Sequence, residues 1–303
     1  MLHIIITAYG EPKATEKAVR CILDQDLPVN TKIIVCDPFP DVKTYIEKKF
    51  GNKIEFFVDP DEGKSTALNI IFNNIWSENI DDIIMMTDGD VFLEKNSVRE
   101  IISKFKDKKV GVVCGHPVPL NDKNTKYGFW AHFQFHCMNL IRKTFAVKDK
   151  FFETSGYLWA IRNGVIKSFP IDSSEDSIVP YLFYDKGYYV DYSENAKVLV
   201  LNPQNWNDWI NQRKRNIKGH STIEKNKPKN SPKRIKTFLN EVKKGVLMSL
   251  SYPKSIKEWI WMLQFYFART YGWFIAYYEM KFKKKKYKDG WRETEMASTR
   301  PLD

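Results

Sequence analysis

Cysteine is scarce in this sequence and is never paired. The 303-residue chain has four cysteines, and their spacing forms neither a CxxC pair nor a metal-finger pattern: Cys21, Cys36, Cys114 and Cys137. A disulfide framework or a zinc finger would need such spacings. We therefore expect free, buried thiols in a reducing compartment.

Other familiar signals are also absent. No internal repeat is apparent, and no HExxH metal-binding motif occurs, although His132 and His136 are four residues apart on an expected helix. Packing or acceptor contact is the favoured interpretation of this pair. His220 is left open as an additional metal or phosphate ligand.

What the chain does contain is an excess of positive charge and a large apolar fraction. The formal net charge is +11, and lysine and arginine concentrate in residues 213–244 and 281–288. Such an excess indicates a polyanionic partner: phosphates, nucleic acid or an anionic membrane surface. With 43% hydrophobic residues, the chain can form one large α/β domain with an appendage, or two domains.

The first 115 residues alternate strand and helix patterns. Strands are expected at residues 2–7, 32–36, 53–58, 82–86 and 110–114, and helices at 14–23, 42–50, 66–76 and 97–105. Repeated units of this kind predict an α/β fold with a mainly parallel sheet and helices on both faces. A helix at 127–145 and strands at 157–162 and 188–192 follow, and residues 225–235 are interpreted as a linker or mobile loop.

One strand runs directly into two aspartates. Asp88 and Asp90 are separated by Gly89 and follow the apolar strand at 82–86. Ligands of open α/β sheets bind beyond the carboxyl ends of the strands. Two carboxylates there suit Mg²⁺ or Mn²⁺, which are commonly held by one or two carboxylates and substrate phosphates. Because Asp-Gly-Asp also forms ordinary turns, the motif alone is not decisive.

Three more polar segments are expected at the same edge of the sheet. They are Thr7–Glu11 after the first strand, Asp37 after the second, and Asp61–Asn69 before a helix. Asp37 is a candidate acceptor for a base N–H group. Tyr9 could stack on that base, and Lys64, near a helix start, could hold a phosphate.

The order of these segments resembles the nucleotide-binding half of family 2 glycosyltransferases. The matching words are TAYGE, IIVCD, EGKSTALN and TDGD, with Gly10 in the place of the usual Asn and Pro38 interrupting a turn. The resemblance implies a GT-A-like fold, a nucleoside-diphosphate sugar donor and an Mg²⁺ or Mn²⁺ cofactor. It implies that Asp90, with Asp88, holds the metal, and it assigns donor binding to Ala8, Tyr9, Glu11, Asp37, Lys64 and Asp88.

The second half is similar to the acceptor side of the same family. Ser155-Gly156 resembles the TGA or SGA segment, Glu175-Asp176 the ED motif, and residues 212–216 (QRKRN) the QxxRW motif. The resemblance implies that Asp176 is the catalytic base with Glu175 beside it, and that Ser155, Gly156 and Gln212 contact the acceptor. Arg213 and Arg215 would clamp the donor diphosphate.

Some alternatives stay open for these residues. Glu175 and Asp176 also suit the first turn of a helix after two serines. Arg213 and Arg215 could form a solvated basic face. Asn216 replaces the family's tryptophan, which argues against processive polymer synthesis, and Trp206 or Trp209 is a candidate substitute.

The carboxyl-terminal part differs in kind from the rest. Residues 259–280 are mostly apolar and rich in aromatics, with Arg269 near their centre, and lysines at 281, 283–286 and 288 follow. Aromatic and lysine residues together favour a helix lying in the interface of an anionic membrane, with a spanning helix and a helix buried against the domain as alternatives. The amino-terminal segment lacks the features of a signal peptide, so we expect the catalytic part at the cytoplasmic side of the cell membrane.

The combined prediction is one GT-A-like domain with a helical, aromatic and basic tail. Residues 1–115 form the nucleotide-sugar half, 116–222 the acceptor and catalytic half, and 223–303 the linker and tail, with 259–288 on the membrane. The expected function is inverting, metal-dependent sugar transfer to a lipid-linked or glycan acceptor, with no nucleic acid partner. The alternatives are a nucleic-acid or anionic-surface binding protein on a retired fold, and a nucleotidyltransferase, which would need a glycine-rich N-terminal loop.

Overall fold

The computed structural model describes residues 1–148, 150–284, 287 and 299. The predicted lysines at 285, 286 and 288 lie outside the described residues. The strands are β1 (Leu2–Thr7), β2 (Thr31–Asp37), β3 (Glu55–Val58), β4 (Ile83–Asp88), β5 (Phe92–Leu93), β6 (Val110–Pro119), β7 (Leu158–Arg162) and β8 (Tyr189–Val200). The α-helices are α1 (Pro12–Leu23), α2 (Pro40–Phe50), α3 (Lys64–Asn74), α4 (Ser97–Lys104), α5 (Lys126–Ala146), α6 (Glu175–Asp185), α7 (Trp206–Asn226), α8 (Phe238–Ser249) and α9 (Ile256–Lys281).

The strands form one mixed sheet in the order β3-β2-β1-β4-β7-β6-β8-β5. The pairs β1–β2, β2–β3, β1–β4 and β6–β8 are parallel, whereas β7 is antiparallel to both of its neighbours and β5 to β8. The predicted α/β architecture with a mainly parallel, helix-flanked sheet is confirmed. The two predicted halves, with their boundary after residue 115, share this sheet, because strand β6 runs across that boundary.

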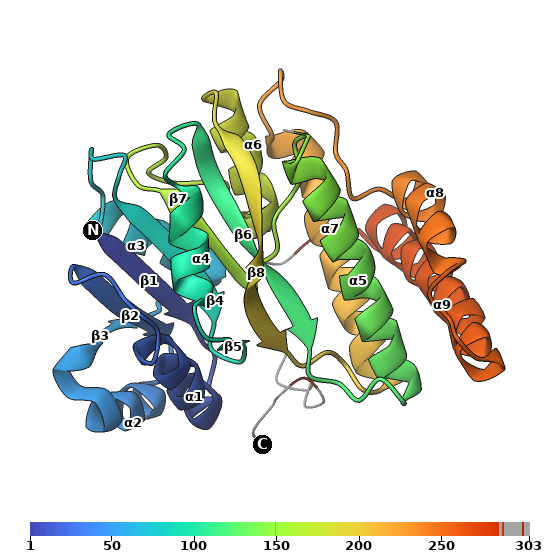
Figure 1. Cartoon of the computed structure of the whole chain (residues 1–303), viewed down its shortest axis with the longest axis horizontal. Coiled ribbons are helices and arrows are strands. Elements are labelled where there is room, and N and C mark those ends of the chain that lie inside the picture. Colours follow the sequence, from blue (N-terminus) through green and yellow to red (C-terminus); the bar gives the residue numbers. More distant parts are fainter. Residues whose placement is uncertain (149, 285–286, 288–298, 300–303) are drawn as a thin grey trace.

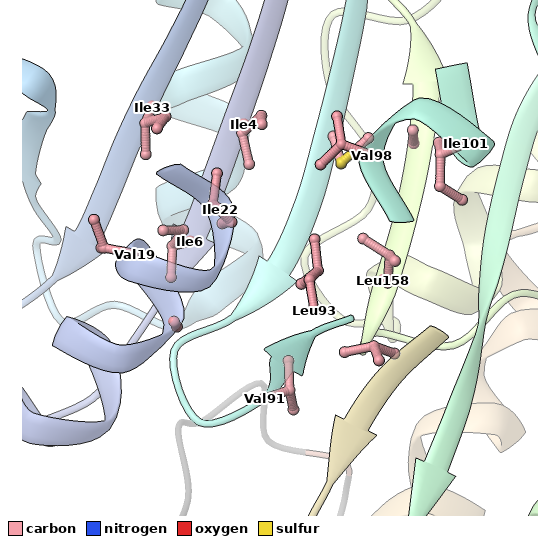
Figure 2. Close-up of a cluster of buried hydrophobic side chains, with 14 of the residues drawn as sticks. Ile4, Ile6, Val19, Ile22, Ile33, Val91, Leu93, Val98, Ile101 and Leu158 are labelled. Carbon is pink, nitrogen blue, oxygen red and sulfur yellow. The ribbon is translucent and has the colours of Figure 1, made fainter. Parts of the chain in front are cut away.

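Helices cover both faces of the sheet, as the sequence pattern predicted. Every residue of β1 is buried, and its side chains alternate between two cores. Ile4 and Ile6 pack with Val19 and Ile22 of α1, in the cluster that also contains residues of α2 and α4 (Figure 2). Ile5 faces the other core, where residues of α3 and α6 pack. A strand buried on both faces reads as a continuous apolar run, which is why this half was predictable.

The helices α5, α7, α8 and α9 stand together on one side of the sheet (Figure 1). An aromatic cluster joins α5, α7 and α9: Phe129, Trp130, Phe133, Trp209 and Phe265 are all buried in it. Edge-on contacts such as Trp130 with Trp209 and Phe133 with Phe265 are favourable geometries for aromatic rings. The aromatic tail therefore packs one of its faces against the domain.

The opposite face of α9 is exposed. Met262, Phe265, Ala268, Gly272 and Ala276 are buried, at helical spacing. The exposed apolar and aromatic residues of α9 lie on the remaining surface of the helix: Ile256, Trp259, Ile260, Leu263, Phe267, Tyr271, Phe274, Tyr277 and Tyr278. In the part of the chain that the structure describes, no helix has both the length and the apolarity needed to cross a bilayer.

Candidate functional site

A cavity of about 480 Å³ opens between the strand ends and the helices α5 to α9. Every residue predicted for the site lines this cavity except Asp37. These residues are Ala8, Tyr9, Glu11, Lys64, Asp88, Asp90, Ser155, Gly156, Glu175, Asp176, Gln212, Arg213 and Arg215. Positions up to 207 residues apart are thus brought to one place, mainly because parallel strands end at the same edge of the sheet.

The pairing of β1 with β4 places the aspartate motif beside the first loop. Thr7 lies opposite Asp88 in the parallel register, and its Oγ1 donates to Asp88 Oδ1 at 3.0 Å. The Gly89 amide donates to the Thr7 carbonyl at 2.8 Å. A Cβ at position 89 would lie 2.7 Å from the Ala8 Cβ, closer than side-chain carbons approach. Glycine is therefore required here by close approach of the two loops.

Asp37 shapes the first loop instead of lining the cavity. Its carboxylate is fully buried and accepts the backbone N–H groups of Gly10 and Phe39, both at 2.8 Å. Burial raises the pKa of Asp37 to about 6, against the two backbone hydrogen bonds, which lower it. Gly10 has a φ of +71°, a conformation that glycine and asparagine both tolerate, so its replacement of the usual Asn preserves the loop. The predicted contact of Asp37 with the base of a nucleotide stays a prediction.

Lys64 connects the two halves of the site. Its Nζ lies 2.6 Å from Asp88 Oδ1 and 3.0 Å from Glu175 Oε1, with only 16% of its side chain exposed. Burial lowers the pKa of this ammonium, but the two carboxylates outweigh it and hold the pKa above its ordinary value. Gly156 faces the same three groups, since a Cβ there would lie 3.9 Å from each. The predicted phosphate contact of Lys64 stays a prediction.

The ED pair opens helix α6, so the capping role and the site position coexist. Ser174 is the N-cap, and Glu175 and Asp176 form the first turn. The hydroxyl of Ser174 donates to Asp176 Oδ1 at 2.5 Å, and the hydroxyl of Thr154 donates to the Asp176 carbonyl at 2.5 Å. Glu175 is engaged with Lys64, so Asp176 is the carboxylate of this pair not bound to that cation.

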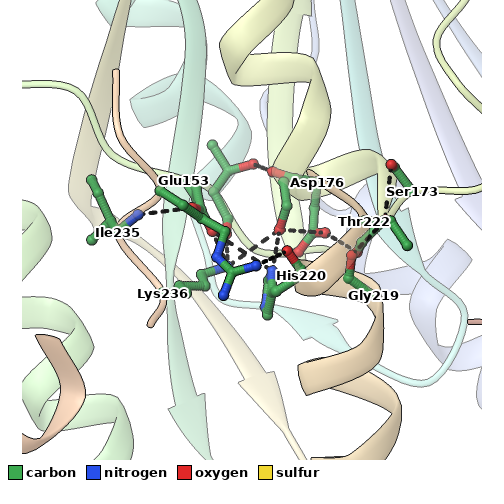
Figure 3. Close-up of polar contacts among 12 residues, drawn as sticks. Glu153, Ser173, Asp176, Gly219, His220, Thr222, Ile235 and Lys236 are labelled. Carbon is green, nitrogen blue, oxygen red and sulfur yellow. Dashed lines mark hydrogen bonds and ion pairs between the residues drawn. The ribbon is translucent and has the colours of Figure 1, made fainter. Parts of the chain in front are cut away.

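Asp176 belongs to a polar network in which Ser177 contacts Asp176, His220 and Lys236 (Figure 3). Glu153 accepts the Tyr181 hydroxyl at 2.9 Å, and Lys236 Nζ lies 3.6 Å from its other oxygen. His220 Nδ1 is 3.1 Å from Ser177 Oγ. Burial, followed by nearby cations, lowers the pKa of His220 well below its ordinary value. His220 lines the cavity and is held in this network by Ser177.

The QRKRN segment lies within helix α7 and faces the cavity. Arg213 is buried and Arg215 partly buried, which excludes a purely solvated basic face for Arg213. Asn216 also lines the cavity, in the place of the family's tryptophan. Neither Trp206 nor Trp209 substitutes for it: the two stack on each other at 5.8 Å, outside the cavity lining.

The remaining histidine pair serves packing. His132 Nε2 lies 2.9 Å from the Asn121 carbonyl, and His136 packs against the Tyr252 ring. Among the described residues, no group of three or more His, Cys, Asp or Glu side chains is placed to hold a metal ion. Asp88 and Asp90 provide two hard oxygen ligands in the cavity, and phosphate oxygens of a ligand would complete the shell that Mg²⁺ or Mn²⁺ takes. The residues present therefore fit such an ion.

Sequence reasoning missed the wall opposite the strand ends. It is built from α5, α8 and α9, with polar members Arg142, Glu241 and Arg269. Glu241 accepts from Arg269 and, at 2.9 Å, from Trp273 Nε1, which joins α8 to α9. The signals in the sequence were Arg269 within a mostly apolar segment and Arg142 within the helix expected at 127–145.

Comparison with known proteins agrees with this geometry. The sequence model described as Glycosyl transferase family 2 matches residues 3–169. The O-antigen chain rhamnosyltransferase WbaN of Salmonella anatum is 28% identical over 130 residues, 40% of this chain and 41% of that protein. The probable glycosyltransferase YdaM of Bacillus subtilis (strain 168) is 23% identical over 239 residues, 73% of this chain and 56% of that protein. The chain thus spans about half the length of these two curated relatives.

A solved structure has the same fold. The mannosyltransferase PcManGT from Pyrobaculum calidifontis, in complex with GDP-Man and Mn²⁺, superimposes with a TM-score of 0.64 at 15% identity. The match covers 94% of this chain and 88% of that one. Since the family match takes in more than half of the sequence, the chain belongs to glycosyl transferase family 2.

Proposed function

We propose that this protein transfers a sugar from a nucleoside-diphosphate sugar to a hydroxyl group of an acceptor, with inversion at the anomeric carbon. The observation that carries the proposal is that Asp88, Asp90 and Asp176 line one and the same cavity. A donor diphosphate held at the strand ends would place its sugar between these carboxylates.

Asp176 would act as the general base. Sugar transfer requires removal of the acceptor hydroxyl proton as the oxygen attacks the anomeric carbon, while the bond to the diphosphate oxygen breaks. Glu175 is bound to Lys64 at 3.0 Å, whereas Asp176 is held by serine hydroxyls. Asp176 thus remains available to accept the proton. Attack from its side, opposite the diphosphate, inverts the anomeric carbon.

The diphosphate leaves with negative charge, which cations of this cavity would stabilise. Arg213 and Arg215 on α7 both line the cavity, and guanidinium groups match phosphate geometry. Asp90, with Asp88, would hold Mg²⁺ or Mn²⁺, which neutralises charge on a departing diphosphate. The complex of the similar solved structure with GDP-Man and Mn²⁺ supports this assignment.

The test is transfer or hydrolysis of labelled nucleotide sugars by purified variants, with Mg²⁺ or Mn²⁺ supplied. Asp176→Asn should lower kcat roughly 10²- to 10⁴-fold, the usual contribution of a general base, with nucleotide affinity preserved. Asp90→Asn should instead abolish metal-dependent nucleotide binding. The control is Asp191→Asn, a carboxylate that pairs with Lys104 outside the cavity. Full turnover in both site variants would refute the mechanism.

We further propose that α9 rests on an anionic membrane at the cytoplasmic face, so that the acceptor is a lipid-linked or membrane-bound glycan. The support is the exposed stripe of α9 (Ile256, Ile260, Leu263, Phe267, Tyr271, Phe274 and Tyr278), which extends along about six helical turns. Lys281, Lys283 and Lys284 follow it. Aromatics at headgroup depth next to lysines are typical of interfacial helices. All four cysteines are free, which fits a reducing compartment.

Vesicle sedimentation tests this placement. The wild type should bind vesicles containing phosphatidylglycerol more strongly than vesicles of phosphatidylcholine alone. The double variant Phe267→Glu/Phe274→Glu should lose binding while its soluble fraction keeps nucleotide binding, because both side chains are exposed (77% and 67%). Equal binding of the variant and the wild type would refute the proposal.

A further inference from the structure

Arg142 is a buried cation without a counter-ion. It lies on α5 and is 2% exposed, and it lines the cavity. Its Nη1 donates to Ser155 Oγ at 3.2 Å, while its buried Nη2 has no hydrogen-bond partner. Among the described residues no carboxylate lies within 4 Å of its guanidinium, as an ion pair would require.

Three other cations with little exposed side-chain surface show how such a charge can be held, whereas Arg213, like Arg142, has a buried nitrogen without a hydrogen-bond partner. Lys64 pairs with two carboxylates, and Arg269 pairs with Glu241. Arg162, 1% exposed, donates to four backbone carbonyls and lies near Asp81. Arg162 is therefore a satisfied structural arginine, whereas Arg142 keeps unused donors. Leaving a buried charge with unmet hydrogen bonds is unfavourable, so such a group is suited to an anionic ligand.

Arg142 lies in the cavity beside Ser155, a residue predicted to contact the acceptor. Ser155, which accepts from Arg142, precedes Gly156, and Gly156 faces Asp88, Glu175 and Lys64. The lining that α5 and α9 contribute is mostly apolar: Phe133, Phe135, Met138, Ile141, Phe265 and Tyr266. Arg213, the other buried arginine of the lining, lies on a different helix, where its Nη2 donates to Gln212. Two separately held arginines suit two anions.

We propose that Arg142, with Ser155, binds a phosphate group carried by the acceptor. This inference rests on the proposed function and specifies its acceptor class: a phosphate ester whose apolar part lies along the wall formed by α5 and α9. Because most of the lining that α5 and α9 contribute is apolar, a lipid phosphate fits it better than a phosphorylated sugar. Arg213 keeps its assignment to the donor diphosphate.

Matched ligands that differ only in the phosphate provide the test, with thermal stabilisation as the readout. Farnesyl phosphate should raise the melting temperature of the wild-type protein well above the effect of farnesol. Arg142→Gln should weaken farnesyl phosphate binding about 10- to 100-fold, the usual effect of losing a charge-assisted hydrogen-bond donor, and leave farnesol binding unchanged. The control is Lys143→Gln on the same helix, whose side chain is 57% exposed and pairs with Glu194.

Two further measurements keep the proposal falsifiable. If Arg142→Gln folds poorly, Arg142→Lys replaces it in the test. Because Arg142→Lys retains the charge, it should bind farnesyl phosphate with a strength between those of the wild type and Arg142→Gln. Comparing glucose 1-phosphate with glucose tests whether the phosphate belongs to a sugar instead of a lipid. If the phosphate increases thermal stabilisation only in this pair, the lipid assignment is overturned. No phosphate effect in either pair would overturn the subsite. Binding of GDP or UDP with Mn²⁺, measured on the same samples, tests the proposed function separately, because Arg142→Gln should leave it unchanged.

Discussion

Replacing Lys64 with methionine tests whether the ion cluster holds the two halves of the site together. The Lys64 ammonium lies between Asp88 and Glu175, whose side chains are 25% and 7% exposed. Methionine preserves the length and apolar volume of the lysine stem but removes the charge. Two carboxylates would then face each other without a cation in a largely buried place.

The expected loss is large for a single substitution. Removing one partner of a buried ion pair costs about 3–5 kcal/mol, because the remaining charges lose their compensation. We take the lower value, about 3 kcal/mol, because Asp88 is partly exposed and solvent will screen it. At ~2–4 °C for each kcal/mol in a chain of this size, the melting temperature should fall by about 6–12 °C at pH 7.5.

Urea denaturation and thermal melts of the metal-free protein measure the effect. Lys32→Met is the control, because Lys32 pairs with Glu55 at an exposed position where an ion pair contributes little. The double variant Lys64→Met/Glu175→Gln should recover part of the loss, since it removes one of the two facing carboxylates. If Lys64→Met loses no more stability than Lys32→Met, the cluster does not hold the site together.

Three further predictions concern backbone packing, the buried network and pH. Gly89→Ala should destabilise the fold by about 1–3 kcal/mol, because its Cβ would lie 2.7 Å from that of Ala8, as urea denaturation will show. Tyr181→Phe should lower the free energy of unfolding by about 1.5–3 kcal/mol, because the hydroxyl donates to a buried carboxylate at 2.9 Å. The pKa of His220 is lowered in the folded protein, so below pH 6.5 the unfolded chain binds a proton that the folded chain does not. The free energy of unfolding therefore decreases as the pH is lowered. His220→Gln should therefore show a shallower loss of stability than the wild type in melts between pH 7.5 and 5.

The first two of these predictions have a matched control. Gly245→Ala should be neutral or stabilising, since a Cβ there would lie 3.7 Å from the Tyr266 hydroxyl, an ordinary van der Waals distance, and alanine favours a helix. Tyr45→Phe removes a hydroxyl bonded to Glu16 near the surface and should have a smaller effect than Tyr181→Phe. The lowered pKa values of His3 and His116 give the same trend with pH and persist in His220→Gln, so the variant should retain part of the slope.

Local patterns predicted the strands and helices of the amino-terminal half closely. The strand expected at residues 2–7 has those bounds, and the helix expected at 97–105 ends one residue earlier. The sequence placed the carboxyl-terminal helix at 259–280, and α9 spans Ile256–Lys281. Helix α8 and the helical state of residues 206–226 were missed, although both segments are amphipathic and follow an asparagine or threonine cap, Asn205 and Thr237.

The sequence by itself determined the order of the motifs and the edge at which they meet. Asp88 and Asp90 follow a strand buried on both faces, and parallel pairing brings Lys64 to them through a neighbouring β-α unit. The patterns that predict these strands and helices are local, since apolar runs and capping residues act over a few positions. A resemblance in motif order then sufficed to predict the fold.

Only the tertiary structure decided which of these groups carry free charge. Asp37 is used by its own loop, Glu175 is neutralised by Lys64, and Arg142 is buried without a counter-ion. These outcomes depend on partners 27 to 111 positions away and on how much water burial removes, and no local pattern encodes either. The direction of β7, the α8–α9 wall and the exposed stripe of α9 were fixed in the same way, by packing between segments far apart in the chain.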